Sequence, residues 1–227
     1  MKRFFLILSL SLLVLSNKFS IAGDSDFNRK IWLQFNPLPL IDYTPRYRFG
    51  LSYIVEKKLG YSLALGYGNE ALNSWWLNGK AWNNGYSFWE IRPELQYYFR
   101  QNNYYSFYSA FEIFYLKVNA VFENGSYGFS NPNQSIKYDE AYFVKQKYGA
   151  HLKLGALVHA RPRLDINFYA GAGVARREID YSNEVNPEVE DYPLFIEWIP
   201  QPYLFEGKTF LVHFTAGFKV NWLIWEK

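Results

Sequence analysis

Cysteine is absent from the 227-residue chain, and histidine occurs only at His151, His159 and His213. Without cysteine, the fold cannot be held by disulfides or by thiolate-bound zinc, and a lipid-modified amino-terminal cysteine is excluded. The three histidines are far apart and show no metal-ligand spacing, and no glycine-rich phosphate loop is found. The sequence therefore predicts neither a metal site nor a bound cofactor.

A strong charge of one sign and a long apolar run are also missing. The formal net charge is +3, and acidic and basic residues are scattered along the chain. This distribution contains no basic stripe, which argues against a nucleic-acid partner. After residue 22, no apolar run approaches the roughly 20 residues that a transmembrane helix requires, which argues against a helical inner-membrane protein.

The first 22 residues are typical of a secretory signal peptide. A basic start at Lys2 and Arg3 precedes an apolar stretch over 4–15, and the small residues Ser20 and Ala22 suit cleavage after Ala22. The apolar stretch is too short to span a bilayer as a helix. We therefore expect residues 1–22 to be removed and residues 23–227 to form one exported domain.

Aromatic residues are abundant: 20 Phe, 20 Tyr and 8 Trp make up 21% of the chain, although its mean hydropathy is only −0.23. These rings must therefore be interleaved with polar residues. Residues 46–55 show the pattern, because Tyr47, Phe49, Leu51, Tyr53 and Val55 alternate with Arg46, Arg48, Gly50 and Ser52. An alternation with a period of two residues predicts β-strands.

Eight segments of this kind are found, and most of them are long. Their approximate ranges are 30–37, 45–55, 60–68, 87–99, 105–118, 142–159, 164–177 and 208–223. Most match the roughly 9–11 residues of a tilted membrane strand rather than the roughly 5–6 usual in soluble sheets. Short connections alternate with long ones at 69–86, 119–141 and 178–207, as in barrels with tight periplasmic turns and long external loops. The predicted fold is all-β: an eight-stranded antiparallel up-and-down transmembrane β-barrel.

The volumes of the two strand faces predict which face lines this barrel. One face carries large aliphatic and aromatic residues, and the other carries small and charged residues. The interior of an eight-stranded barrel holds little more than its own side chains, so the bulky face should meet lipid. The inward face then holds a lumen charge cluster of Arg46, Arg48, Glu90, Arg92, Glu94, Glu112, Lys147, His151, Lys153, Arg177, His213 and Lys219. Buried charges persist when they are paired, so we expect a salt-bridged plug.

Two positions conflict with regular strands. Pro93 falls inside the fourth segment and cannot donate a ladder hydrogen bond, which predicts a bulge or a local distortion. In the fifth segment Glu112 has the parity of Phe114, whereas Lys117 has the parity of Tyr115. This loss of phase predicts a bulge near the outer end of the segment.

Several short motifs resemble those of a known group. They are Asn-Pro-Leu at 36–38, the alternating strand at 47–53, the turn at 57–63 and Gly-Ala-Gly at 171–173. With the predicted signal peptide, they make the chain similar to small outer-membrane β-barrel families of Bacteroidota, over nearly the whole chain after residue 22. This resemblance implies an outer-membrane barrel, and because those families have no assigned reaction it implies no catalytic residues. More distantly, the chain is similar to the OmpA, OmpX and OmpW type of eight-stranded barrel.

The predicted external loops hold candidate contact residues, because loops usually carry the function of rigid barrels. These candidates are Trp75, Trp76, Trp82, Tyr86, Phe195, Trp198 and Tyr203. Exposed Trp among Asn and Gly suits contact with a glycan or a protein partner, although such rings can also cover the barrel mouth or enter the headgroup layer. The favoured function is a structural or surface-interaction role in the outer membrane, with outer-membrane lipid around the barrel.

Three alternatives remain open. The lumen could conduct as a narrow pore, although large and charged inward residues should block eight strands. The protein could be a lipid-modifying enzyme, but among the stretches 151–153, 159–161 and 213–215 only His213 has a hydroxyl two residues away, at Thr215. Thr is seldom a nucleophile without a specialised activator, so the sequence favours a protein that is not an enzyme. If the aromatic face is buried instead, the chain would be a secreted, lipocalin-like ligand-binding barrel.

Overall fold

The computed structural model describes residues 29–56, 58–72, 84–128, 134–190 and 205–226. They form one antiparallel sheet, and within these ranges no helix is long and apolar enough to cross a membrane. The predicted signal peptide at 1–22 lies outside the described residues. The prediction of an all-β fold is therefore confirmed for the part of the chain that the structure describes.

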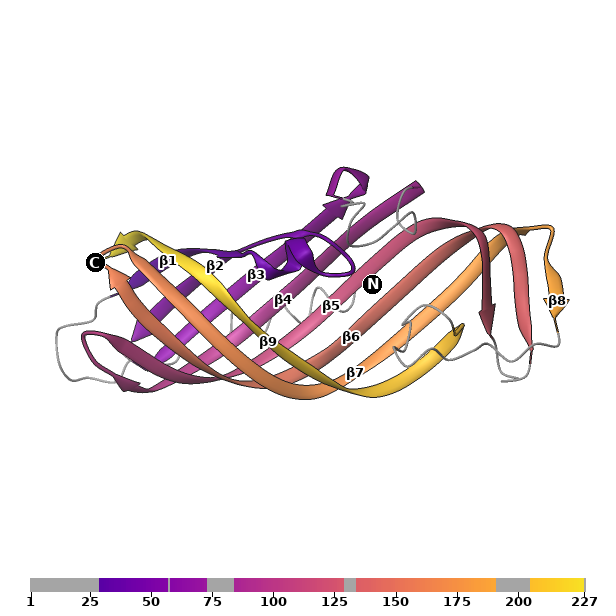
Figure 1. The fold of residues 1–227 in the computed structure, drawn as a ribbon. Helices are drawn as coiled ribbons and strands as arrows, with labels where there is room; N and C mark the ends of the chain where they lie inside the picture. Colours follow the sequence, from indigo (N-terminus) through magenta and orange to yellow (C-terminus); the bar gives the residue numbers. More distant parts are fainter. Residues whose placement is uncertain (1–28, 57, 73–83, 129–133, 191–204, 227) are drawn as a thin grey trace, which may run out of the picture.

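The strands pair in sequence order, and the sheet closes on itself (Figure 1). The order is β1 (Lys30–Asn36), β2 (Tyr47–Glu56), β3 (Leu59–Asn69), β4 (Asn84–Gln101), β5 (Tyr105–Gly128), β6 (Ser135–Arg161) and β7 (Leu164–Val185). β9 (Gly207–Glu226) pairs with both β7 and β1, which closes a ring of eight strands. A ninth strand, β8 (Glu188–Glu190), was not expected; it is short and pairs with β6 beyond the end of the β6–β7 ladder.

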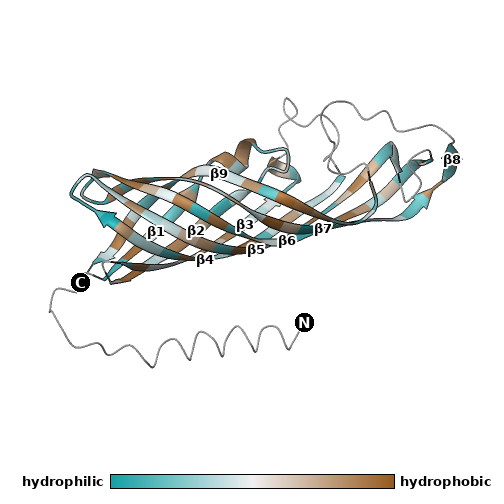
Figure 2. Ribbon diagram, turned by 90° about the horizontal axis from the view of Figure 1, so that it is seen from below, coloured by the Kyte–Doolittle hydropathy of each residue, from teal (hydrophilic) through white to brown (hydrophobic). Residues whose placement is uncertain are grey.

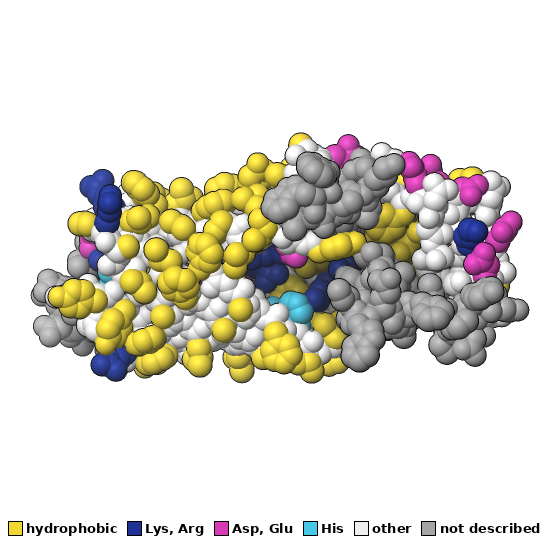
Figure 3. Space-filling model, viewed as in Figure 1, with side chains coloured by type: hydrophobic (Ala, Val, Ile, Leu, Met, Phe, Trp, Pro, Cys, Tyr) yellow, Lys and Arg dark blue, Asp and Glu magenta, His cyan; other side chains and the backbone are white. Residues whose placement is uncertain are grey.

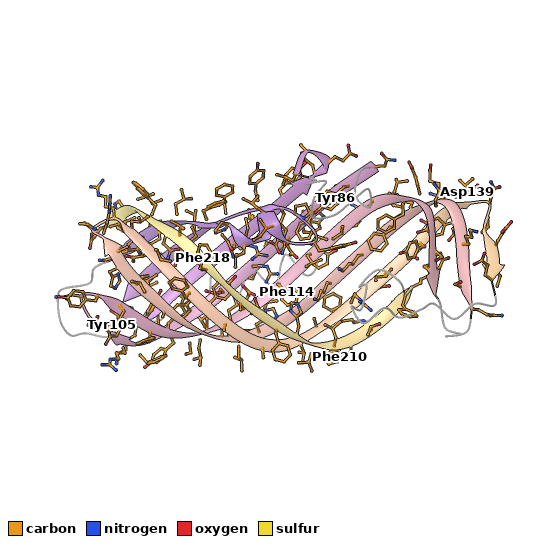
Figure 4. All side chains as sticks on the ribbon, viewed as in Figure 1. Tyr86, Tyr105, Phe114, Asp139, Phe210 and Phe218 are labelled. Carbon is orange, nitrogen blue, oxygen red and sulfur yellow. The ribbon has the colours of Figure 1, made fainter. Side chains whose placement is uncertain are left out.

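The two ends of the ring differ. Tight turns at 101–105 and 161–164 connect strands at one end, where Figure 4 shows Tyr105. At the other end, two short 3-10 helices, η1 (Leu38–Ile41) and η2 (Glu70–Leu72), follow β1 and β3. β5, β6 and β7 have 24, 27 and 22 residues whereas β1 has 7, so these three strands extend far beyond the rest of the ring, as Figures 1 and 2 show.

Side chains alternate between the inside and the outside of the ring, as expected for strands. On β3 and β4, for example, Leu63, Leu65 and Leu95 are exposed, while Ser62, Ala64 and Glu94 are buried. Figure 2 shows the alternation as bands of opposite hydropathy along the ribbon, and Figure 3 shows apolar side chains covering the wall near the turn end. The large face therefore points outward, and the small and polar face lines the ring interior.

Towards the end of the ring opposite the tight turns, this distribution is reversed: polar residues face outward and the ring interior is apolar. A buried aromatic cluster there consists of Tyr86, Phe88, Leu116, Val118, Ala120, Phe122, Tyr127, Tyr138, Ala141, Phe143, Ile179 and Tyr181. Tyr127 and Tyr181 stack with their ring centroids 4.1 Å apart, and Phe122 lies against Phe143 at 4.9 Å. The expectation that bulky residues would overfill the interior is therefore wrong for this part of the molecule.

The reversal also explains the loss of phase in the fifth segment. A register shift does lie near its outer end, between Asn84 and Ser87 opposite Val121 and Asn119, but the extra residue is on β4, so the bulge predicted in the fifth segment itself is wrong. The β5–β6 ladder keeps one register from Tyr105↔Val158 to Gly128↔Ser135, so Leu116 faces inward and Lys117 outward without any insertion. The polarity of the faces changes there, not the phase of the strand. Pro93 pairs with Leu63 on one side, but the β4–β5 ladder is interrupted at the two positions between Ile91 and Glu94, without a register shift. The sequence predicts a bulge or a local distortion at Pro93, and the structure shows the distortion and no bulge.

Two predicted loops contain long strand segments. β5 and β6 occupy most of 119–141, and β7 continues to Val185 within the expected loop at 178–207. Tyr86, expected as an exposed loop contact, lies in β4, is 2% exposed and donates a hydrogen bond to the carbonyl of Pro45 at 2.9 Å. The loop prediction is therefore wrong for Tyr86. The candidates Trp75, Trp76, Trp82, Phe195, Trp198 and Tyr203 lie outside the described residues.

Candidate functional site: the polar interior of the ring

The structure places the twelve residues of the lumen charge cluster at inward-facing positions. Nine are buried: Arg46, Arg48, Glu90, Arg92, Glu94, Glu112, His151, Lys153 and Lys219. The other three, Lys147, Arg177 and His213, are partly exposed. The cluster therefore consists of a closed inner part and a more accessible group on β6, β7 and β9.

Glu90 is the centre of one half of the buried network. Its carboxylate accepts hydrogen bonds from Arg46 at 3.1 Å, from Arg92 at 2.9 Å and from both ends of the Arg48 fork. Gly66 makes room for this carboxylate, since a Cβ there would lie 2.5 Å from its Oε1 atom. Hydrogen bonds between guanidinium groups and a carboxylate are charge-assisted and therefore stronger than neutral ones, so the three arginines hold Glu90 firmly in place.

Glu112 and Glu94 organise the other half. Arg92 donates to Glu112 at 2.9 Å, which joins the two halves, and Lys153 bonds both Glu112 and Glu94, the latter at 2.6 Å. Lys219 lies 3.3 Å from Glu94. Five cations, Arg46, Arg48, Arg92, Lys153 and Lys219, share the three buried carboxylates of Glu90, Glu94 and Glu112. Arg46 also pairs with Asp42, which is partly exposed, at 2.6 Å.

Glu112 also begins a chain of two imidazoles. His151 Nδ1 lies 3.0 Å from Glu112, and His151 Nε2 lies 2.6 Å from Nδ1 of His213. Two neutral imidazoles beside an ionised Glu112 would share one order of hydrogen bonds, in which His151 donates from Nδ1 and accepts at Nε2 and His213 donates from Nδ1. The remaining His213 nitrogen, Nε2, is then an acceptor on the partly exposed side of the cluster.

A second polar group lies near the turn end, and the sequence did not suggest it. Ser106 Oγ is 3.1 Å from His159 Nε2, and His159 Nδ1 is 3.1 Å from Asp165 Oδ1. His159 and Asp165 are direct cross-strand partners on β6 and β7, and Ser106 comes from β5. Only strand pairing brings Ser106 to a histidine 53 residues away, so local spacing carries no signal for this arrangement.

The Ser106–His159–Asp165 group has the hydrogen-bond order of a nucleophile, a base and an orienting carboxylate. Asp165 is 1% exposed, and the side chain of His159 is 30% exposed towards solvent. The same contacts also satisfy a buried carboxylate without any reaction. Among the described residues no group of three or more His, Asp or Glu is arranged to hold a metal ion.

A cavity of about 560 Å³ lies on the outside of the ring, between β6, β7 and the start of β9. Glu178, Asp180, Glu206 and Lys208 contribute to its lining, and Lys208 pairs with Glu178 at 3.1 Å. Burial, reinforced by Asp180 and Glu184, raises the pKa of the Glu206 carboxyl. This cavity is acidic, unlike the cationic ring interior.

Comparisons with protein-family models, with curated proteins and with solved structures gave no match. The resemblance to small outer-membrane barrels of Bacteroidota therefore remains a prediction from the sequence motifs. The function has to be argued from the geometry of this chain.

Proposed function

We propose that this protein is an integral outer-membrane β-barrel with a plugged lumen, whose outer end serves a structural or surface-interaction role. A closed antiparallel sheet leaves no strand edge along most of its wall, which is the condition for a β-structure in lipid. The ion pairs inside fill the space that an open channel would need.

The observation that carries this proposal is an apolar band with a common polar boundary. Outward residues are predominantly apolar from Phe107 to Tyr115, Tyr148 to Val158 and Ile166 to Val174. Each span is close to the roughly 9–11 residues that a tilted membrane strand requires. Immediately beyond, Lys117, Gln146, Glu178 and Lys208 face outward and pair across four neighbouring strands. A soluble protein has no reason to expose such a band or to end it along one row.

The extension of β5, β6 and β7 beyond this row favours contact with a partner outside the cell. Its outward residues are mostly polar, and its interior is the aromatic cluster, so it resembles a soluble domain built on a membrane wall. Figure 3 shows acidic side chains gathered at this end. A surface glycan or a protein ligand is the partner class that the loop tryptophans of the sequence favour.

Single cysteines test the topology cleanly, because the native chain has none. Leu63→Cys lies in the band, Val189→Cys on β8 beyond it, and Tyr104→Cys in a tight turn. With a maleimide on a polymer too large for porins, we expect intact cells to label Val189→Cys only. Tyr104→Cys should react after the outer membrane is opened, and Leu63→Cys only after denaturation. Labelling of Tyr104→Cys instead of Val189→Cys on intact cells would exclude the proposed orientation, and labelling of Leu63→Cys on intact cells would exclude the membrane location.

A second candidate function, lipid-ester hydrolysis, is favoured by the Ser106–His159–Asp165 group. Ser106 Oγ would attack the carbonyl carbon of an ester while His159 Nε2 takes the hydroxyl proton and then delivers it to the leaving alcohol. Water would hydrolyse the acyl-serine in the same way. Asp165 would hold the imidazole in the required tautomer.

A fluorophosphonate probe distinguishes this candidate from a purely structural hydrogen-bond group. If Ser106 is a nucleophile, the folded protein is labelled, and Ser106→Ala and Asp165→Asn lose the label. Ser62→Ala is the matched control, because Ser62 is also buried but bonds Gln34 at 2.8 Å. An unlabelled wild-type protein, or label that persists in Ser106→Ala, removes the hydrolase.

A further inference from the structure

The wall of the ring is incomplete beside the outer half of β9. β1 pairs with β9 only from Lys30↔Glu226 to Phe35↔Val220, whereas β7 accompanies β9 as far as Gly207. Residues 207–219 of β9 therefore have a strand on one edge only, among the described residues. After Asn36 the chain leaves the wall and turns into η1. Unpaired backbone at membrane depth is tolerated where it lines a water-filled space rather than lipid.

Figure 3 shows a hollow in this part of the wall, with Lys or Arg and His side chains visible inside it. The three members of the lumen charge cluster that are partly exposed, Lys147, Arg177 and His213, lie on β6, β7 and β9 next to the open edge. Lys147 pairs with Arg177, which pairs with Thr209 on the edge strand. Lys145 is also partly exposed and faces inward, two residues before Lys147 on the same face of β6.

Two lysines at this opening are poorly compensated. Lys145 and Lys147 form no ion pair with a described carboxylate, and Asp42 is an acid that acts on both. Asp42 is already bound to Arg46, at 2.6 Å. Cations inside a membrane protein are costly unless they are paired, so Lys145 and Lys147 indicate a site for an anion.

The position of these cations points to the kind of anion. Lys147 and Arg177 adjoin Gln146 and Glu178, which belong to the polar row that ends the apolar band. Phosphate groups of a bilayer lie at this boundary. On the outside of β9, just within the band, Phe210, Val212 and Phe214 are 71%, 66% and 75% exposed. Figure 4 shows Phe210 on this strand. If a lipid headgroup occupied the opening, its acyl chains would lie against Phe210, Val212 and Phe214.

We propose that this side opening binds a phosphate group through Lys145, Lys147 and Arg177, with a phospholipid headgroup entering laterally past β9. The inference rests on the proposed membrane location, because only the bilayer brings a headgroup to this height. The same chemistry would accept free phosphate, which would enter from water. The buried ion pairs of the inner cluster form the floor of the site and keep the anion from passing through the barrel.

The test compares two lipids with the same acyl chains, phosphatidic acid and diacylglycerol, on the folded protein in detergent by native mass spectrometry. We expect the wild-type protein to retain phosphatidic acid preferentially. The double variant Lys145→Gln, Lys147→Gln should reduce this preference at least about tenfold, since each lysine contributes a charge-assisted contact. The matched control is Lys58→Gln, Lys137→Gln, which removes two exposed cations elsewhere and should leave the preference unchanged.

Inorganic phosphate distinguishes the two sources. Displacement of phosphatidic acid by millimolar phosphate would show that the site takes the anion from either source, and retention of the lipid would show that the acyl chains are needed. Equal retention of the two lipids by the wild type, or an unchanged preference in Lys145→Gln, Lys147→Gln, would overturn the inference. Each sample is also run on a gel without and with boiling. A protein whose mobility does not change on boiling would contradict the proposed membrane barrel, whereas a protein that shows the change but no lipid preference would contradict only the phosphate site.

Discussion

At the residue scale, the account depends on how three carboxylates hold the cations of the ring interior. Glu90 illustrates the principle, because Arg46, Arg48 and Arg92 all bond to it and its side chain is fully buried. A buried ion pair contributes little compared with a well-packed apolar pair, but removing one partner leaves the others uncompensated. The inner cluster is therefore sensitive to single changes.

Glu90→Ala should lower the free energy of unfolding by about 3–5 kcal/mol, because three guanidinium groups lose their carboxylate. The measurement is urea unfolding of the folded protein in detergent, followed by tryptophan fluorescence. Glu190→Gln is the control: its partner Lys137 lies 3.6 Å away on the surface, and its loss should cost less than about 1 kcal/mol. Equal effects of the two substitutions would contradict the plug.

Gly155 shows how a small inward-facing residue leaves space for a large side chain in the ring interior. A Cβ at Gly155 would lie 2.2 Å from the buried ring of Tyr108, whose hydroxyl donates to Asn167 at 2.8 Å. We expect Gly155→Val to destabilise the protein by about 1–3 kcal/mol through overpacking. Ala156→Val, one position along the strand and on the outward face, should be nearly neutral in the same urea titration. A neutral Gly155→Val would contradict the inward assignment.

At the element scale, the parts of the strands near the tight turns were predictable from the sequence, and the parts at the opposite end were not. The segment predicted at 60–68 is observed as Leu59–Asn69, because large and small residues alternate along all of it. The segment predicted at 105–118 continues to Gly128. Beyond Leu116 apolar residues face inward and polar ones outward, so the polarity that marks a membrane strand is reversed while its period is unchanged.

The site was predictable to a similar extent. Parity alone indicates which ionisable residues face inward, since it follows from the pleat. It does not give their partners, because Arg46 and Glu90, or Ser106 and His159, meet only through pairing between strands. The incomplete wall beside β9 also has no local signature, because it results from the difference in length between β1 and β9.

The extension of β5, β6 and β7 should unfold independently of the ring. Tyr181 contacts Tyr127, Tyr138 and Phe143 within the aromatic cluster. We expect Tyr181→Ala to speed hydrogen exchange in the outer parts of these strands and to leave exchange near the tight turns unchanged. Tyr142→Ala, at an exposed position on β6, is the control. A uniform rise in exchange along the strands would mean that ring and extension unfold as one unit.

At the scale of the whole molecule, side chains of different kinds occupy successive parts of the ring interior. The ion pairs of the inner cluster lie in the middle, and the aromatic cluster lies towards the far end. Eight strands leave room for little besides such side chains. Such an interior favours a membrane-embedded protein with the extension of β5, β6 and β7 outside the membrane over a channel.

We therefore expect no regular conductance steps when the purified wild-type protein is added to planar lipid bilayers. A porin reconstituted in the same membranes provides the positive control. Reproducible steps of uniform size would favour the narrow pore instead, and would require the inner ion pairs to rearrange.

The proposed membrane barrel is best tested by the gel mobility of the protein from the outer-membrane fraction, without and with boiling. A closed membrane barrel resists detergent until it is heated, so we predict that the unboiled chain and the boiled chain migrate with different mobilities. A protein found in the soluble periplasmic fraction, with the same mobility before and after boiling, would contradict the account. The exposed aromatic wall would then have to be covered by protein rather than by lipid.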